Sequence, residues 1–418
     1  MKRHIFFLLF IFSLQHLSAQ QQNKTPVYFQ FASQQNRAKL YKKYIDTTIR
    51  QSLSEPLTDS TEGEWNEAFW AMEFIVYKND FSKKKLTKAW QKANNLSEYF
   101  QKNLLEVSYA LYPVEFKKYA AGLLSITGSA PVFVRCAEYL LRADPGSTAS
   151  IQNLIQTKYK DSDYPGVSIL RNRLASLNKV NSLPPLKDIF SKDFLKNQTV
   201  IYSLQRKNRD YPGLVIIRQP NGKFVRNKDG SIFHVSQLAR AVTNYPFYIT
   251  NGNTPQGIFR WSGFDVSKLS FIGPTPNLQL TLPIEAKPSV FFSDSSLVNV
   301  VWQKNMYASM LPSSWKNFEG IYESFYAGMM GRNEIIMHGT TVDPAYYKGQ
   351  LYYPQTPSLG CLCSYEEWNN KGERVKSNQQ QIVDVLDEID SSNGYVVVIE
   401  LNDLKKAVNI ADVQKFLR

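Results

Sequence analysis

The 418-residue chain has few of the residues that build covalent or metal-bound frameworks: three cysteines and four histidines. So sparse and odd a cysteine count excludes a disulfide-stabilised scaffold. Cys136 lies in a helical pattern and is interpreted as a buried apolar residue. Only His234 and His338 lie beyond the first 20 residues, so we expect no metal site and no cofactor. At least one free thiol therefore needs a chemical explanation.

The sequence also lacks an apolar run long enough to cross a bilayer as a helix, which takes about 20 residues. Its N-terminal run, Ile5–Leu14, is only about ten residues long, follows Lys2 and Arg3, and precedes Leu17-Ser18-Ala19. This order is typical of a cleavable signal peptide. We therefore predict a signal peptide at residues 1–19, export to the periplasm, and no transmembrane anchor.

No tract of basic residues is present, although the formal net charge is +13. Lysine and arginine are spread along the chain, so the charge is interpreted as a solubility and steering effect, and nucleic acid is not an expected partner. A hydrophobic content of 43% excludes a disordered chain and supports packed cores.

Residues 24–190 are predicted to form an all-α domain. Helical spacing marks segments 64–77, 84–93, 96–111, 114–126, 130–143, 147–157 and 167–177. Helix pairs joined by short polar turns are similar in look to HEAT-type repeats, which predicts a solenoid-like domain. An irregular helical bundle is the alternative, because no clean repeat consensus is present. Asp144-Pro145-Gly146 should end one helix, and Ser182–Pro185 is the predicted linker.

Residues 195–405 are predicted to form a β-rich domain, followed by a C-terminal helix at 406–418. Predicted strands are 199–204, 214–218, 247–250, 271–272, 278–282, 334–337 and 395–401, bounded by proline and glycine turns. Segment 295–330 and segment 379–389 have helical patterns. The fold class is thus multidomain, an all-α domain followed by a β-rich one.

A thiol and an imidazole in the second domain could act together in nucleophilic chemistry. His338-Gly339 follows an apolar strand, and Gly360 precedes Cys361. An imidazole can take the proton of a thiol and return it to a leaving amine. A carbonyl oxygen can fix the imidazole tautomer, and N–H groups in a glycine turn can stabilise an oxyanion. From spacing alone, a structural cysteine and histidine remain the alternative.

Three ordered segments resemble the catalytic domain of the L,D-transpeptidase (YkuD-type) family. Segment 248–259 resembles the family's strand, glycine turn and Thr-Pro-x-Gly, segment 336–340 its His-Gly-Thr, and segment 358–361 its Ser-His-Gly-Cys. The resemblance covers about half the chain. It implies a YkuD-like fold and a cysteine acyltransferase that acts on peptidoglycan stem peptides, releasing D-alanine and passing the acyl group to an amine.

The resemblance also implies residue roles. Cys361 would be the nucleophile, His338 the general base and acid, Gly339 the carbonyl that orients the base, and Gly360 part of the oxyanion turn. Substrate contacts are assigned to Ser358, Leu359, Cys363, Thr254, Tyr353 and Arg332. Leu359 stands where the family has a second histidine, and Cys363 where it has arginine or asparagine. For Arg332 the alternative is a solvated loop residue, and for Tyr353 a packing role.

Two other functions remain open from the sequence. The thioester could pass to water, which would make the protein a carboxypeptidase, or an amidase that releases a wall-linked group. Alternatively, the chain could be a catalytically degenerate cell-wall binding protein whose helical domain recruits a protein partner. The last hypothesis predicts no covalent adduct on Cys361.

Overall fold

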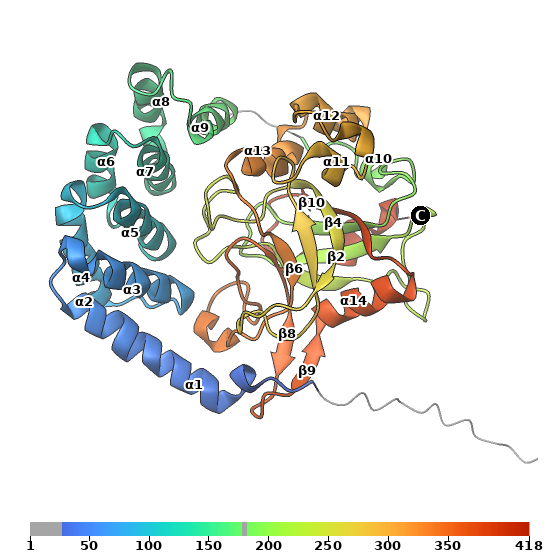
Figure 1. Cartoon of the computed structure of the whole chain (residues 1–418), viewed down its shortest axis with the longest axis horizontal. Helices are drawn as coiled ribbons and strands as arrows, with labels where there is room; N and C mark the ends of the chain where they lie inside the picture. The colour runs from blue at the N-terminus through green and yellow to red at the C-terminus, as the bar shows by residue number, and fades with distance from the viewer. Residues whose placement is uncertain (1–26, 178–181, 418) are drawn as a thin grey trace, which may run out of the picture.

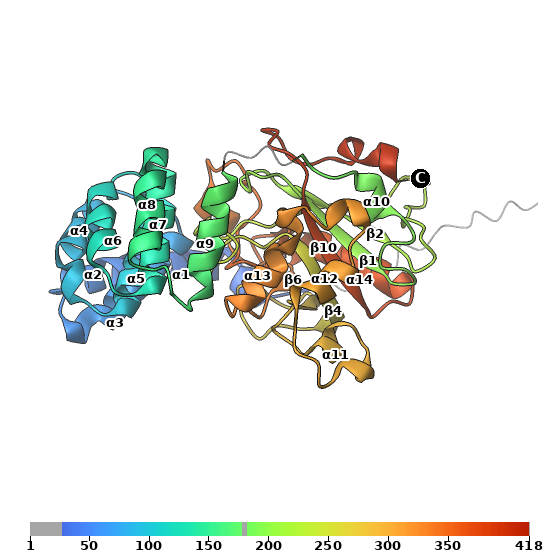
Figure 2. The same cartoon turned by 90° about the horizontal axis from the view of Figure 1, so that it is seen from above.

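The computed structural model describes residues 27–177 and 182–417, and it consists of a helical N-terminal half beside a β-rich C-terminal half (Figures 1 and 2). The predicted signal peptide, residues 1–19, lies outside the described residues. Within the described ranges, no helix is both long enough and apolar enough to cross a membrane.

The helical half follows the predicted segments closely. Its helices are α1 (Gln34–Lys43), α2 (Ser52–Ser54), α3 (Glu62–Phe74), α4 (Asp80–Lys92), α5 (Glu98–Leu111), α6 (Lys117–Ile126), α7 (Ala130–Ala143), α8 (Thr148–Thr157) and α9 (Pro165–Ser176). A π-helical stretch, Tyr44–Gln51, joins α1 to α2. Side-chain caps fix several starts, as where Ser129 accepts from the N–H of Val132 ahead of α7.

These helices form a curved double row. Helix α5 packs against α3 and α7, and α7 packs against α9. In Figure 1 the row α3, α5, α7 and α9 lies nearer the barrel, and α4, α6 and α8 lie outside it. The predicted all-α half is therefore confirmed, while its kinship with a repeat family stays a prediction.

The β-rich half is built on a closed eight-stranded barrel in the order β1-β10-β4-β5-β6-β7-β3-β2. Its strands are β1 (Val200–Gln205), β2 (Gly213–Arg218), β3 (Val235–Leu238), β4 (Gly257–Asp265), β5 (Asn277–Thr281), β6 (Ile336–His338), β7 (Leu362–Ser364) and β10 (Asn393–Glu400). Strands β8 (Glu366–Trp368) and β9 (Arg374–Ser377) form a separate hairpin. Two pairs, β1 with β10 and β6 with β7, are parallel.

The barrel strands have continuous apolar sequences because both the inner and the outer face of the barrel are covered by other residues. Ile201 belongs to a cluster that draws on all eight barrel strands, which places it in the interior. Its neighbours Val200 and Tyr202 belong to a second cluster on the outer face. Successive side chains of a strand point to opposite faces, so two cores require a continuous apolar sequence.

Helices cover this outer cluster. They are α10 (Leu186–Phe190), α11 (Pro288–Phe291), α12 (Lys304–Ser309) and α13 (Glu323–Met329), and α14 (Asn378–Glu388) packs on the interior cluster. Helix α10 falls inside the predicted 24–190 domain, yet Ile189 and Phe190 pack with the barrel. The predicted C-terminal helix is wrong in form: two 3₁₀ turns, Ile410–Asp412 and Gln414–Phe416, replace it. Arg206 binds Asp412 at 2.6 Å and holds the tail against the barrel.

Two predicted strands are wrong, and both lie where the halves meet. Residues 247–250 and 271–272 form turns. Tyr248 and Ile249 instead insert into the core of the helical half, and the Tyr248 hydroxyl donates to Glu138 at 2.5 Å. Phe271 packs on Phe74 of α3, with ring centroids 4.9 Å apart. Tertiary burial outweighed the local strand preference of these apolar residues.

Candidate active site

The thiol and the imidazole face the same side of the barrel from neighbouring strands. In the parallel pair β6–β7, Met337 lies opposite Leu362, and His338 lies opposite Cys363. Met337 and Leu362 point into the barrel interior. Since side chains alternate along a strand, His338 and Cys361 point outward, towards the helical half. Segments some 20 residues apart are thus brought side by side.

The His338 ring is buried and held through one nitrogen. Its Nδ1 lies 2.5 Å from the carbonyl oxygen of Gly339, so Nδ1 carries the proton and Nε2 is left as the basic atom. The side chain is 6% exposed, and burial lowers its pKa to about 4. The imidazole is therefore neutral at physiological pH and able to accept a proton.

A buried carboxyl that the sequence analysis missed fixes this segment. Glu366 accepts from the N–H of Thr340 at 2.9 Å and from the hydroxyls of Thr275 and Ser377 at 2.6 and 2.5 Å. A Cβ on Gly339 would lie 2.3 Å from the Glu366 carboxyl carbon, so only glycine fits beside it. The signal was present, because Glu366 shares the inward face of β8 with Trp368.

The Cys361 sulfur rests against the start of β6. It accepts from the N–H of Ile336 at 3.5 Å and lies 3.6 Å from the carbonyl oxygen of Glu334. Among the described residues no hydrogen bond joins it to His338. Burial raises the pKa of the thiol, while the Ile336 N–H and the Arg332 guanidinium act in the opposite direction. The resting pair is a neutral thiol and a neutral imidazole.

The turn before Cys361 is shaped by two hydroxyls. Ser358 Oγ accepts from the N–H of Gly360 at 3.1 Å and donates to the carbonyl of Cys361 at 2.8 Å. Thr254 Oγ1 lies 3.0 Å from the carbonyl of Gly360. Gly360 has a φ of +114°, a conformation that other residues rarely adopt. These hydrogen bonds hold the turn in one conformation.

Arg332 stabilises the backbone that contacts this turn. It is 7% exposed and donates to the carbonyls of Phe247, Asn253 at 2.9 Å and Gly252 at 3.0 Å. Burial lowers its pKa to about 10. These contacts give Arg332 a structural role, and they differ from the solvated loop position that was its alternative. Arg332 also lines the cavity that contains Cys361, so its contact with a substrate stays a prediction.

One cavity of about 600 Å³ contains both reactive side chains. His338, Cys361 and Leu359 line it on the barrel side, and Leu359 is 49% exposed. Trp70 and Phe74 of α3 line it from the helical half. No local sequence signal shows that these two aromatic residues of the helical half face a cavity shared with the barrel half.

Other predicted site residues lie away from this cavity. Cys363 is 2% exposed, and its sulfur lies 3.7 Å from the hydroxyl of Thr356. Tyr353 is 46% exposed and is not among the described residues that line the cavity. Thr254 is fully buried and acts on the backbone of the turn. In the part of the chain that the structure describes, no group of three acidic, histidine or cysteine side chains could hold a metal.

The thiol environment predicts the pH dependence of alkylation. Because the pKa of Cys361 is raised and His338 is neutral above about pH 5, no preformed thiolate–imidazolium pair should exist. The iodoacetamide rate should then rise about tenfold per pH unit from pH 6 to 8. Cys363, whose pKa burial raises to about 12, should stay unlabelled in the folded protein. A rate that is flat across neutral pH would contradict this description.

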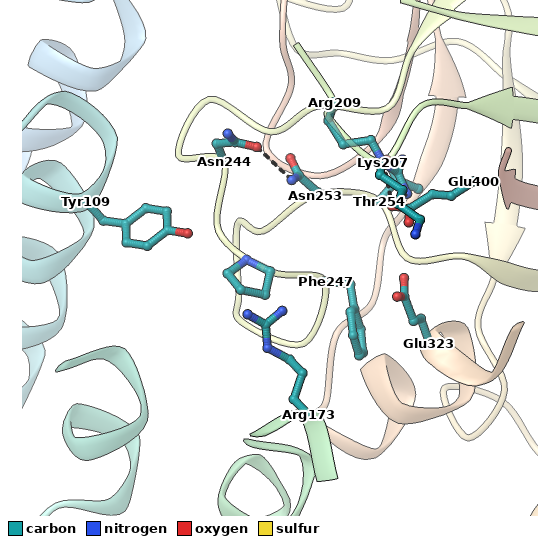
Figure 3. A pocket seen from close by; sticks show the side chains of 11 residues that line it. Tyr109, Arg173, Lys207, Arg209, Asn244, Phe247, Asn253, Thr254, Glu323 and Glu400 are labelled. Atoms are coloured by element: carbon teal, nitrogen blue, oxygen red, sulfur yellow. Dashed lines mark hydrogen bonds and ion pairs between the residues drawn. The ribbon is translucent and has the colours of Figure 1, made fainter. Parts of the chain in front are cut away.

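A separate cavity of about 300 Å³ lies between the halves (Figure 3). Its walls include Tyr109, Arg173, Lys207, Arg209, Asn244, Asn253, Thr254, Glu323 and Glu400. Both carboxyls here have partners: Arg209 lies 2.9 Å from Glu400, and the N–H of Gln256 donates to Glu323 at 2.9 Å. Burial, followed by the charge of Glu400, raises the pKa of Glu323 to about 8.

Comparisons of the chain with protein-family models, with curated proteins and with solved structures found no match in any of the three. The function of the site is therefore inferred from its own residues and their geometry.

Proposed function

We propose that the protein is an exported cysteine acyltransferase with a YkuD-like catalytic domain, acting on peptidoglycan stem peptides in the periplasm. The observation that carries the proposal is the placement of Cys361 and His338. His338 ends strand β6, Cys361 directly precedes the adjacent parallel strand β7, and both line one cavity. The resemblance of three ordered segments to L,D-transpeptidases supplies the substrate class.

The first half-reaction forms a thioester. A rotation about the Cα–Cβ bond of Cys361 would turn the sulfur from the Glu334 carbonyl towards His338 Nε2, which takes the thiol proton. The thiolate attacks the carbonyl carbon of the scissile peptide bond. The imidazolium then returns the proton to the leaving amine of D-alanine as the carbon–nitrogen bond breaks. The Gly339 carbonyl favours this imidazolium, since it accepts from Nδ1.

The turn at Cys361 would stabilise the oxyanion. The N–H of Gly360 already donates to Ser358, whereas among the described residues no acceptor is bonded to the N–H of Cys361. That N–H is the donor we assign to the developing charge. In the second half-reaction an amine attacks the thioester, gives its proton to His338, and releases the Cys361 thiol.

The test is an intact mass measurement. The protein incubated with a tetrapeptide stem or a carbapenem should gain the mass of an acyl group. Cys361→Ala should lose the adduct entirely, and Cys136→Ala, fully buried in α7, should keep it. Cys363→Ala should also keep it, because the label resides on Cys361.

An adduct that survives in Cys361→Ala, or no adduct with either compound, would overturn the proposal. Product analysis on muropeptides then identifies the acceptor. Cross-linked dimers indicate an amine, and release of D-alanine without dimers indicates water.

A further inference from the structure

A third cavity, of about 430 Å³, opens in the helical half next to the thiol cavity. Glu73 of α3 and Glu106 of α5 line it, together with Asn66. Trp70 and Asn251 line both this cavity and the one that contains Cys361. The two cavities therefore share walls, although the carboxyls take no part in the thiol chemistry described above.

One carboxyl in this cavity has no partner. Glu106 accepts from the amide of Asn251 at 2.9 Å. Burial raises the pKa of Glu106, and this hydrogen bond and the charge of the nearby Arg135 oppose that rise. Glu73 is only 5% exposed, and no side chain of the described residues donates to it or forms an ion pair with it. Burial raises its pKa, and the charge of Glu106 raises it further.

An unpartnered buried carboxyl is costly unless a ligand satisfies it. The contrast with the interdomain cavity of Figure 3 is informative, because there Arg209 and Gln256 satisfy Glu400 and Glu323. Here no cationic side chain of the described residues forms an ion pair with Glu73 or Glu106, although Arg135 lies near Glu106. Phe69 and Trp70 also line the cavity, and aromatic side chains attract organic cations.

The ligand chemistry can be narrowed further. No group of three acidic, histidine or cysteine side chains suited to a metal occurs in residues 27–177 and 182–417. A divalent ion needs about six oxygen ligands, whereas an ammonium group needs three acceptors. Glu73 contributes two carboxyl oxygens and Glu106 the one that Asn251 does not bind, which together supply three acceptors.

We propose that the Glu73–Glu106 cavity is a binding site for the primary ammonium group of an aliphatic amine. The ammonium lies between the two carboxyls, and the alkyl chain lies along Trp70. This gives the helical half a ligand of its own. The binding does not depend on the thiol reaction, so it would stand even if the proposed acyl transfer failed.

Calorimetric titration of the full protein with n-pentylamine and with 1-pentanol tests the proposal. The amine should bind at least about tenfold more tightly than the alcohol, because only the amine donates charge-assisted hydrogen bonds. Glu73→Gln should weaken amine binding by about tenfold or more. Glu64→Gln, exposed on the same helix, is the matched control and should bind like the wild type.

Cys361→Ala should also bind the amine normally, which separates this site from the proposed catalysis. The folding of Glu73→Gln is checked by its thermal midpoint, which should equal or exceed that of the wild type since a buried carboxyl is neutralised. Equal binding of amine and alcohol, or unchanged binding by Glu73→Gln, would overturn the proposal. Displacement of the bound amine by an equimolar amount of magnesium ions would also overturn the proposal.

Discussion

Gly360→Ala is expected to lower the free energy of unfolding by about 3 kcal/mol or more. Two effects add. The φ of +114° strains any residue with a side chain, and the new Cβ would lie 2.3 Å from Arg332 Nη2 and 2.7 Å from the carbonyl oxygen of Gly252. Arg332 cannot retreat without breaking its hydrogen bonds to buried carbonyls. Urea unfolding followed by circular dichroism measures the change.

Gly349→Ala is the matched control for this variant. Gly349 also has a positive φ, +93°, but no atom lies within 4 Å of the place that a Cβ would occupy there. It should show the backbone strain alone, about 1 kcal/mol. If the two variants lose the same stability, the close approach of Arg332 to the turn is not what makes glycine necessary at position 360.

His338→Asn is expected to slow acylation of Cys361 by about 10²–10⁴-fold. The substitution removes the basic nitrogen that takes the thiol proton. The acid limb of the wild-type rate should fall near pH 4, because burial lowers the His338 pKa to about 4 from an ordinary 6.5. Stopped-flow or mass-resolved acylation by a carbapenem measures both effects. His234→Asn, in an exposed position, should acylate at the wild-type rate.

The stability of the same variant has an expected pH dependence. In the wild type, the unfolded imidazole binds a proton near pH 6.5 and the folded one only near pH 4. The free energy of unfolding therefore decreases as the pH falls from about 6.5 to 4. The His338 imidazole accounts for up to ~3 kcal/mol of this decrease. The asparagine variant should lack that contribution.

An acylation rate unaffected by the substitution would remove His338 from the proposed mechanism.

Secondary-structure elements whose boundaries are set by neighbouring residues could be predicted from the sequence. Helix α7 begins and ends at the predicted residues, because Ser129 caps its start and Asp144-Pro145-Gly146 stops it. Segment 247–250 was predicted as a strand for its apolar residues, and its turn conformation depends on Glu138, about 110 positions earlier in the chain. Hydrophobic periodicity along the sequence does not reveal a contact between residues so far apart in the chain.

The candidate site likewise contains residues that the sequence predicts and residues that it does not. Cys361, His338 and the Gly339 carbonyl were predicted together, and the structure brings the first two into one cavity and joins the histidine to that carbonyl. Glu366 was missed because its only local signal, the alternation with Trp368, does not by itself mark a buried carboxyl. The roles of Arg332 and Cys363 depend on burial, which a single sequence specifies poorly for individual polar residues.

The core of the helical half is not confined to that half. Tyr245, Tyr248, Ile249, Val342 and Tyr347 of the barrel half are buried within it, and Tyr109 stacks on Tyr245 with ring centroids 4.2 Å apart. A chain cut at the linker would leave these side chains in water and remove one wall of the thiol cavity. The two halves have different architectures, yet they share one hydrophobic core, so exchanging either half by recombination would require rebuilding that core and the cavity that contains Cys361.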